Sequence, residues 1–245
     1  MAFGQKPEYD FYSEFRTWMQ QSRGQDPTLT RARMLEQYTA KLKREAVAEA
    51  EIARRLNLII TSRDALEDDF WNRFFTEGKA AFNTAPNSFL TEVVEGRNPG
   101  AALDVGMGQG RNAIFLAKLG WQSYGFDPAA EAVALGQKRA KALGLTIHTA
   151  TVRDSEYEFG KNRFDLVLFS WVPPNPESAR KVVDSLKPDG VVVMEFGADW
   201  LGRNEALKMF DSLQVVRYQI VNAKSDFFNR REMEILRMVA RKVGK

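Results

Sequence analysis

The run ALDVGMGQGRNAIFLA, residues 102–117, constrains the fold more than any other part of the sequence. A short apolar segment with the character of a strand leads into Gly106, Gly108 and Gly110, and a helical pattern follows at once. Glycine permits positive φ and lets a ligand lie directly on the backbone. The first turn of the following helix offers free N–H groups and a partial positive charge. The run therefore predicts a ligand-binding loop between a parallel strand and a helix.

The spacing of the glycines distinguishes two classes of ligand. The dinucleotide pattern Gly-x-Gly-x-x-Gly fails, because its third glycine position is occupied by Arg111. The loop reads Gly-x-Gly-x-Gly instead, and Asp104 stands two residues before its first glycine. An acid at this turn suits a ligand that carries an ammonium group and no pyrophosphate. S-adenosylmethionine is such a ligand, with its amino-acid end expected beside Asp104 and Gly106, whereas a nicotinamide oxidoreductase is disfavoured.

Two more carboxylates follow at the ends of the next expected strands. Asp127 ends the strand at 122–127, where one carboxylate can accept hydrogen bonds from both ribose hydroxyls. Asp154 follows the strand at 145–152, where it can accept from the amino group of an adenine. Either residue alone could be a helix cap or a turn residue, and nicotinamide cofactors also use an acid like Asp127. Acids at the ends of three successive strands together favour a nucleoside site.

The rest of the chain divides into two regimes. Residues 1–90 show no convincing strand and read as helices, the last of them ending at Gly78, whereas short apolar runs alternate with helical segments after residue 100. The loop EGRNPG at 95–100 predicts a helical cap over 1–95 and a ligand-binding domain over 96–245. The expected strands are 101–105, 122–127, 145–152, 164–171, 191–196, 214–223 and 232–241, of which the last two should pair antiparallel because no helix separates them.

The segments LDVGMGQGR, GFD, TVRD, RFDLVLFSW and LKPDGVVVMEF together resemble the class I S-adenosylmethionine-dependent methyltransferases. The resemblance covers roughly residues 98–245. It implies an α/β, Rossmann-like seven-stranded sheet of order 3-2-1-4-5-7-6 with its last strand antiparallel. Met107 stands where many relatives carry cysteine or another small residue, and we expect it to change little because the loop acts through its backbone. The implied cofactor contacts are Asp104, Gly106, Met107, Gly108, Gly110, Asp127, Pro128, Asp154, Ser155 and Ser170.

No catalytic residue is assigned by the sequence. Methyl transfer from a sulfonium needs mainly positioning and desolvation, and a base only where the acceptor must lose a proton. Ser170 and Trp171 end the fourth strand, either facing the acceptor or simply leading into a rigid proline loop. Tyr9 and Tyr12 could cover the site from the cap or form the cap's own core. The following VPPN lacks the spacing of the Asp/Asn/Ser-Pro-Pro-aromatic motif, so we reject methylation of nucleic-acid bases on this evidence.

The composition excludes several other kinds of chemistry. Without cysteine and with His148 as the single histidine, the chain has no cysteine nucleophile and no multi-histidine metal site, and we expect His148 to be an ordinary strand residue. A net charge of +3 gives no strong nucleic-acid signal. No apolar run approaches the roughly 20 residues of a membrane span, so a cytoplasmic protein is expected. We therefore expect a small-molecule methyl acceptor. The alternatives are a catalytically silent cofactor-binding partner protein or an enzyme that methylates RNA or protein, and the oligomeric state is open.

Overall fold

The computed structural model describes residues 7–25, 31–76, 83–227 and 232–244. The chain forms two compact units, Met1–Phe74 and Phe75–Lys245. The division precedes the helix α5 (Ser88–Val94) instead of following residue 95. The physical reason is that Phe89 and Leu90 of α5 are buried against the sheet of the second unit, which makes this helix part of that unit.

The first unit is helical, and no strand occurs among its described residues. Its helices are α1 (Pro7–Gln25), α2 (Arg31–Arg44), α3 (Glu49–Thr61) and α4 (Arg63–Thr76), the last of which runs to the start of the second unit. None of the described helices is both long and apolar enough to cross a membrane. The core consists of side chains that recur every three or four residues along the helices: Phe11, Tyr12, Phe15, Met34, Tyr38, Leu42, Ile52, Ile59 and Leu66.

Tyr12 lies in this core. Its side chain is buried, and its hydroxyl donates a hydrogen bond to Glu67 Oε1 at 2.7 Å. Burial and the neighbouring Glu67 carboxylate both raise the pKa of Tyr12. Because a proton-transfer group needs a pKa near the working pH, this environment fits a packing residue and disfavours a catalytic base. The side chain of Tyr9 and the expected helix end at Gly78 lie outside the described residues.

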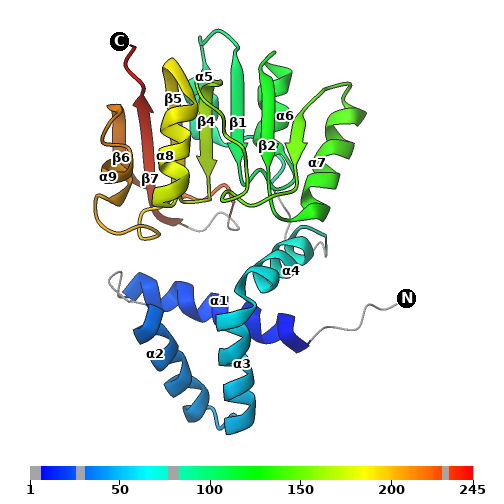
Figure 1. Cartoon of the computed structure of the whole chain (residues 1–245), viewed down its shortest axis with the longest axis vertical. Helices are drawn as coiled ribbons and strands as arrows, with labels where there is room; N and C mark the ends of the chain where they lie inside the picture. The colour runs from blue at the N-terminus through cyan, green and yellow to red at the C-terminus, as the bar shows by residue number, and fades with distance from the viewer. Residues whose placement is uncertain (1–6, 26–30, 77–82, 228–231, 245) are drawn as a thin grey trace. The chain divides into compact units, whose positions relative to one another are not determined.

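The second unit is built on a seven-stranded sheet of order β3-β2-β1-β4-β5-β7-β6, as the resemblance implied (Figure 1). Strands β1 to β5 run parallel, and β7 pairs antiparallel with both β5 and β6. The strands are β1 (Ala101–Val105), β2 (Gln122–Phe126), β3 (His148–Ala150), β4 (Phe164–Ser170), β5 (Leu186–Gly197), β6 (Gln214–Lys224) and β7 (Glu232–Arg241). Because the parallel strands point the same way, their carboxyl ends form one edge, where ligands bind in sheets of this kind.

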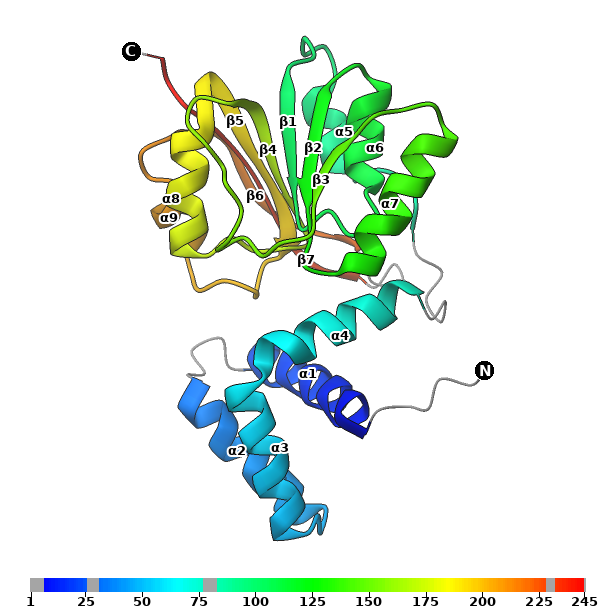
Figure 2. The ribbon, with the colours of Figure 1, turned by 45° about the vertical axis from the view of Figure 1, so that its right-hand side comes forward.

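Helices cover both faces of the sheet, as Figure 2 shows with the sheet seen nearly edge-on. One face carries α5, α6 (Arg111–Lys118) and α7 (Ala130–Ala142), and the other carries α8 (Pro176–Ser185) and α9 (Glu205–Met209). The central strands are buried on both faces, which explains why the sequence of β4 is a continuous apolar run. Apolar side chains form a core on each face of the sheet. These cores hold the strands in register and so fix the positions of the strand ends.

Two expected boundaries differ from the structure. The strand predicted at 145–152 pairs with β2 only over His148–Ala150. His148 is exposed and its ring stacks on Tyr124 at 4.8 Å, as expected for a strand residue. The strand expected at 191–196 begins earlier, at Leu186, because α8 already ends at Ser185.

Candidate functional site

The glycine loop has the backbone that its sequence predicts. Gly106, Gly108 and Gly110 have φ values of 66°, 51° and 72°, all in the left-handed region that favours glycine. Gly110 is the N-cap of α6 and has no side chain with which to cap the helix. The loop therefore turns sharply from β1 into α6 and leaves backbone groups close to any ligand that lies on it.

Asp104 supplies the cap that Gly110 lacks. The amide of Ala113, in the first turn of α6, donates to Asp104 Oδ2 at 3.2 Å. The Asp104 side chain is only 1% exposed, and this burial raises its pKa to about 7, opposed by the nearby Arg111 guanidinium. Asp104 thus holds the helix start in place from beneath the loop, in addition to any contact with a ligand ammonium group.

Met107 has a structural part that its sequence position did not indicate. Its buried side chain lies beneath the loop against glycines of β2 and α7. A Cβ at Gly125 would lie 2.6 Å from Met107 Sδ, and one at Gly136 would lie 3.0 Å from Met107 Cε. The expectation that Met107 matters little is therefore incomplete: its side chain supports the loop and requires glycine at two positions that the sequence analysis did not single out.

Asp127 lies at the end of β2 and contacts the glycine loop. Its Oδ2 accepts from the amide of Gly108 at 2.9 Å, and its Oδ1 accepts from the amide of Ala129 at 2.8 Å. A carboxylate is an acceptor with two oxygens, so Asp127 has the chemistry to bind the hydroxyls of a ribose. Asp127 is buried and the adjacent Pro128 is half-buried, which fixes the carboxylate beside the loop.

Asp154 and Ser155 lie beyond β3, at the same edge of the sheet. Asp154 Oδ2 accepts from the side-chain amide of Asn175, which also caps α8. The backbone oxygen of Ser155 accepts from Lys181 Nζ at 3.1 Å, and the Ser155 side chain is exposed. These contacts tie the segment after β3 to the start of α8.

The end of β4 places Ser170 and Trp171 at the centre of the edge. Ser170 is 8% exposed, and its Oγ has no hydrogen-bond partner among the described residues. Trp171 has a φ of 61°, which is rare for a bulky residue, and its amide donates to the backbone oxygen of Glu195 at 2.8 Å. A buried hydroxyl without a partner, next to strained backbone, is typical of a ligand site.

Two apolar side chains lie directly on the loop. A Cβ at Gly106 would lie 2.6 Å from Val172 Cγ2, and one at Gly108 would lie 2.7 Å from Cζ of Phe75. Gln109 Nε2 also donates to the backbone oxygen of Phe75 at 2.9 Å. A ligand on the loop must therefore contact or displace these two side chains, which the sequence analysis did not identify.

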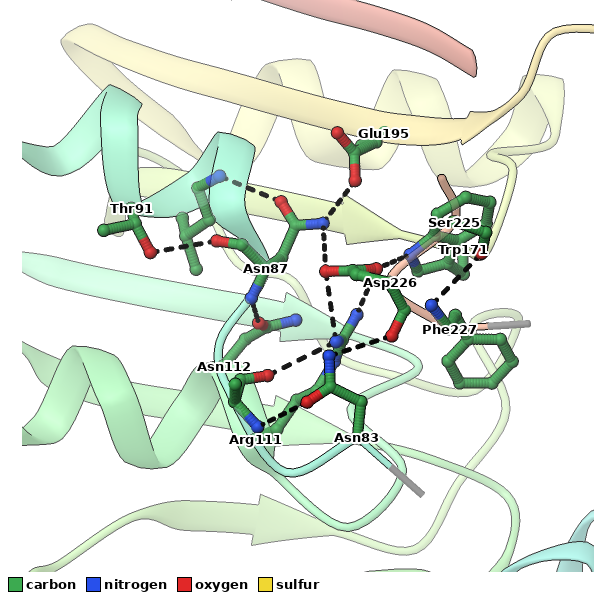
Figure 3. Close-up of polar contacts among 12 residues, drawn as sticks. Asn83, Asn87, Thr91, Arg111, Asn112, Trp171, Glu195, Ser225, Asp226 and Phe227 are labelled. Carbon is green, nitrogen blue, oxygen red and sulfur yellow. Dashed lines mark hydrogen bonds and ion pairs between the residues drawn. The ribbon is translucent and has the colours of Figure 1, made fainter. Parts of the chain in front are cut away.

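A polar network centred on Asp226 completes the edge (Figure 3). Asp226 follows β6, and its carboxylate accepts from Trp171 Nε1 at 2.6 Å and Asn87 Nδ2 at 3.2 Å. The guanidinium of Arg111 binds both of its oxygens, at 3.1 and 3.2 Å. These residues come from distant parts of the chain, so no local pattern in the sequence could have indicated them.

Asn87 connects this network to the end of β5. It caps α5, since the amide of Leu90 donates to Asn87 Oδ1 at 2.9 Å, and its Nδ2 donates to Glu195 as well as to Asp226. Arg237 Nε lies 2.6 Å from Glu195 Oε2. Burial raises the pKa of Glu195, whereas the hydrogen bond from Asn87 and the charge of Arg237 oppose the rise.

The electrostatics of this edge suit a cationic ligand. Among the described residues, the buried charged residues are Asp104, Asp127, Glu195 and Arg111, and all four lie here. Buried carboxylates outnumber buried guanidinium groups, so a positively charged ligand is favoured and a pyrophosphate is not. The glycine backbone, the buried Asp127 carboxylate and the unpaired Ser170 hydroxyl all fit a sulfonium nucleoside.

The strand order, the antiparallel β7 and the glycine loop define the class I methyltransferase fold. Residues 102–190 match the model of a family described as a methyltransferase domain. The match identifies a methyltransferase domain over these residues, and S-adenosylmethionine is the cofactor that this family implies. No curated protein sequence matches the chain.

Several solved structures share the fold at low sequence identity. A SAM-dependent methyltransferase from Methanosarcina mazei is 15% identical, with a TM-score of 0.56 over 66% of this chain and 100% of that one. The N-methyltransferase NodS from Bradyrhizobium japonicum is also 15% identical, with a TM-score of 0.52 over 64% and 93%. The [4+2]-cyclase SpnF is 16% identical, with a TM-score of 0.59 over 74% and 95%. At these identities the likeness concerns the fold alone.

Proposed function

We propose that the protein transfers the methyl group of S-adenosylmethionine to a small molecule, at an oxygen, nitrogen or sulfur atom. The observation that carries the proposal is the left-handed glycine loop with Asp127 bound to it and the unpaired Ser170 hydroxyl beside it. A structural neighbour supports methyl transfer, since NodS is titled an N-methyltransferase. The mild net charge of +3 does not favour a nucleic-acid acceptor.

In this proposal the chain's own residues bind and orient the cofactor. The backbone of the glycine loop and the buried Asp104 receive its amino-acid end, and the Asp127 carboxylate, held beside the loop, accepts from the ribose hydroxyls. We assign the adenine to Asp154 and Ser155, which contacts with Asn175 and Lys181 fix next to α8. When bound, the cofactor supplies an electrophilic methyl group on a sulfonium.

The residues beyond the loop provide positioning and desolvation, the two effects on which transfer of a sulfonium methyl group mainly depends. Ser170 is aligned across the sheet with Glu195, and the amide of Trp171 is fixed to the same residue. Phe75 and Val172 cover the loop with apolar surface. The proposal assigns no base, because the carboxylates of Glu195 and Asp226 are already bound by N–H donors.

Isothermal titration with S-adenosylmethionine and S-adenosylhomocysteine tests the cofactor site. We expect saturable binding of both, and release of S-adenosylhomocysteine when a panel of small phenols, amines and thiols is added with S-adenosylmethionine. No binding at millimolar cofactor would refute the proposal.

A second candidate function is a protein that binds the cofactor without transferring its methyl group. The neighbour titled a [4+2]-cyclase favours it, because that protein shares the fold but is named for a different reaction. Cofactor binding without product release from any acceptor, in the same assay, distinguishes this candidate from the methyltransferase.

A further inference from the structure

We infer that Asp226 is a positioning residue that fixes Trp171 and, through it, an aromatic wall for an uncharged, flat methyl acceptor. The inference rests on the proposed function, since it concerns the acceptor side of the same site. It begins from a carboxylate that the family match does not cover, because residues 102–190 end before Asp226.

The Asp226 carboxylate is saturated with donors and so cannot act as a base. Oδ1 accepts from Trp171 Nε1 at 2.6 Å and from Arg111 Nη2 at 3.1 Å. Oδ2 accepts from Arg111 Nη1 and from Asn87 Nδ2, each at 3.2 Å. With two donors on each oxygen, the lone-pair sites are filled and no site remains to take a proton from an acceptor. We call this arrangement, in which Arg111 and Asn87 hold the Asp226 carboxylate and Asp226 holds the indole of Trp171, the clamp.

The clamp restrains the side chain of Trp171, and the backbone of this residue is itself in an unusual conformation. Trp171 has a left-handed φ of 61° directly after β4, and a conformation of this kind persists only where surrounding contacts enforce it. Its amide donates to the backbone oxygen of Glu195. Its indole N–H donates to Asp226, a contact that Figure 3 shows. The preceding residue is Ser170, with its unpaired buried hydroxyl.

Two further aromatic rings pack on Trp171. The ring of Phe227 is stacked on it at 6.2 Å with an interplanar angle of 16°, and the ring of Trp200 meets it edge-on at 5.8 Å. Trp200 lies on the end of β5, since a Cβ at Gly197 would lie 2.5 Å from Trp200 Nε1. Trp171 is buried, whereas Trp200 and Phe227 are partly exposed, so these two rings present the surface of the wall.

The chemistry of this wall indicates the class of acceptor. Aromatic rings favour flat apolar partners, and the neighbouring charges of Asp226, Arg111 and Glu195 are paired within the protein. An acceptor that carried a carboxylate would find no unpaired cation among the described residues of this network and would lose its hydration on entering. We therefore expect an uncharged aromatic or similarly flat acceptor.

The first experiment follows the indole N–H of Trp171 by NMR, assigned among the five tryptophans with Trp171→Phe. Loss of the carboxylate in Asp226→Asn should move this resonance upfield, because the charge-assisted hydrogen bond is lost. The matched control is Asp199→Asn, which makes the same change at an exposed carboxylate near the end of β5. An unmoved Trp171 resonance in Asp226→Asn would overturn the inference.

The second experiment measures binding of 2-naphthol and 2-naphthoate to protein saturated with S-adenosylhomocysteine. We expect 2-naphthol to bind more tightly than 2-naphthoate. Asp226→Asn should raise the dissociation constant of 2-naphthol about tenfold, because one charge-assisted hydrogen bond to Trp171 is lost. Asp199→Asn should bind 2-naphthol normally, and all variants should keep their affinity for S-adenosylhomocysteine. Equal binding of the two probes, or unchanged 2-naphthol binding in Asp226→Asn, would overturn the inference. Failure to bind S-adenosylhomocysteine in the unmodified protein would instead refute the proposed function.

A double-mutant cycle separates positioning from general loosening of the fold. If Asp226 acts through Trp171, Trp171→Phe should weaken 2-naphthol as well, and adding Asp226→Asn to it should cause little further loss. Additive effects of the two changes would mean that Asp226 does not act through the indole. Gly197→Ala should also weaken 2-naphthol, because it displaces Trp200 without touching the clamp.

Discussion

Asp127 offers the sharpest test of the cofactor site, because its contribution to stability and its contribution to ligand binding can be measured separately. In Asp127→Asn only one side-chain oxygen remains, so one of the two amides that it now binds, Gly108 or Ala129, must face an NH₂ group. An unsatisfied buried donor costs about 1–3 kcal/mol, which should appear as a lower free energy of unfolding in urea. The same change removes the charge that would bind the ribose hydroxyls.

Hydrogen bonds to a charged group contribute about 1.5–3 kcal/mol, so the dissociation constant of S-adenosylhomocysteine should rise by about 10- to 150-fold. Isothermal titration measures this change directly. A 2′,3′-dideoxy analogue of S-adenosylhomocysteine should bind the variant and the unmodified protein with nearly equal affinity, because it has no hydroxyls for the carboxylate to accept from. A variant that binds the natural product within about threefold of the unmodified protein would refute the assignment.

Asp165→Asn is the matched control. Asp165 Oδ2 accepts from the amide of Ala101 and from Lys187 Nζ, both at 2.7 Å, at the opposite end of β1. Its replacement should also lower the free energy of unfolding, but it should leave cofactor affinity unchanged. If both variants weaken binding equally, the effect in Asp127→Asn comes from loss of stability and not from a ligand contact.

Three further changes test other parts of the structure. Gly125→Ala should lower stability by about 1–3 kcal/mol in urea unfolding, because its Cβ would lie 2.6 Å from Met107 Sδ, and adding Met107→Ala should restore part of the loss. Asp104 has a folded-state pKa of about 7, above that of an unfolded aspartate, so the folded state binds more protons between about pH 4 and 7. The free energy of unfolding of the unmodified protein, measured in urea, should therefore rise as the pH falls through this range. Asp104→Asn should show a smaller rise. Tyr12→Phe should destabilise the helical unit by about 1 kcal/mol in thermal unfolding, since it leaves Glu67 without the hydroxyl donor, with no change in the pH dependence of turnover.

The fold could be predicted because its signals are local. Strands β1 and β4 are short apolar runs, and the glycines after β1 occupy left-handed positions that few other residues tolerate. The absence of a helical pattern between 214–223 and 232–241 was enough to predict their antiparallel pairing. Short-range patterns failed only at boundaries such as β3, where pairing with β2 and not the apolar run itself decides the length.

The acceptor side could not be predicted in the same way, because its contacts join distant segments. Asp226 binds Arg111 across 115 residues and Asn87 across 139. Asn87 did carry one local signal, an asparagine directly before a helix, but that signal explains only the cap of α5. Nothing in the spacing of Asp226 distinguishes it from an ordinary loop residue, so its partners emerge only once the sheet has brought the strand ends together.

The two sides of the site also differ in the kind of group that holds each carboxylate. Asp104 and Asp127 are held by backbone amides, which remain when neighbouring side chains change. Glu195 and Asp226 are held by side chains, including Asn87, which donates to both. Side-chain contacts make the acceptor side sensitive to single substitutions, whereas the cofactor side depends mainly on the backbone.

Asn87→Ala tests this difference. The change removes the cap of α5, at a cost of about 1 kcal/mol in stability, and takes the shared donor from both acceptor-side carboxylates. We expect the affinity for S-adenosylhomocysteine to stay the same, while kcat/KM changes unequally across a panel of acceptors, because the clamp on Trp171 is loosened. A fall in cofactor affinity as large as the fall in kcat/KM would contradict the separation, since it would mean that one connected network holds both ligands.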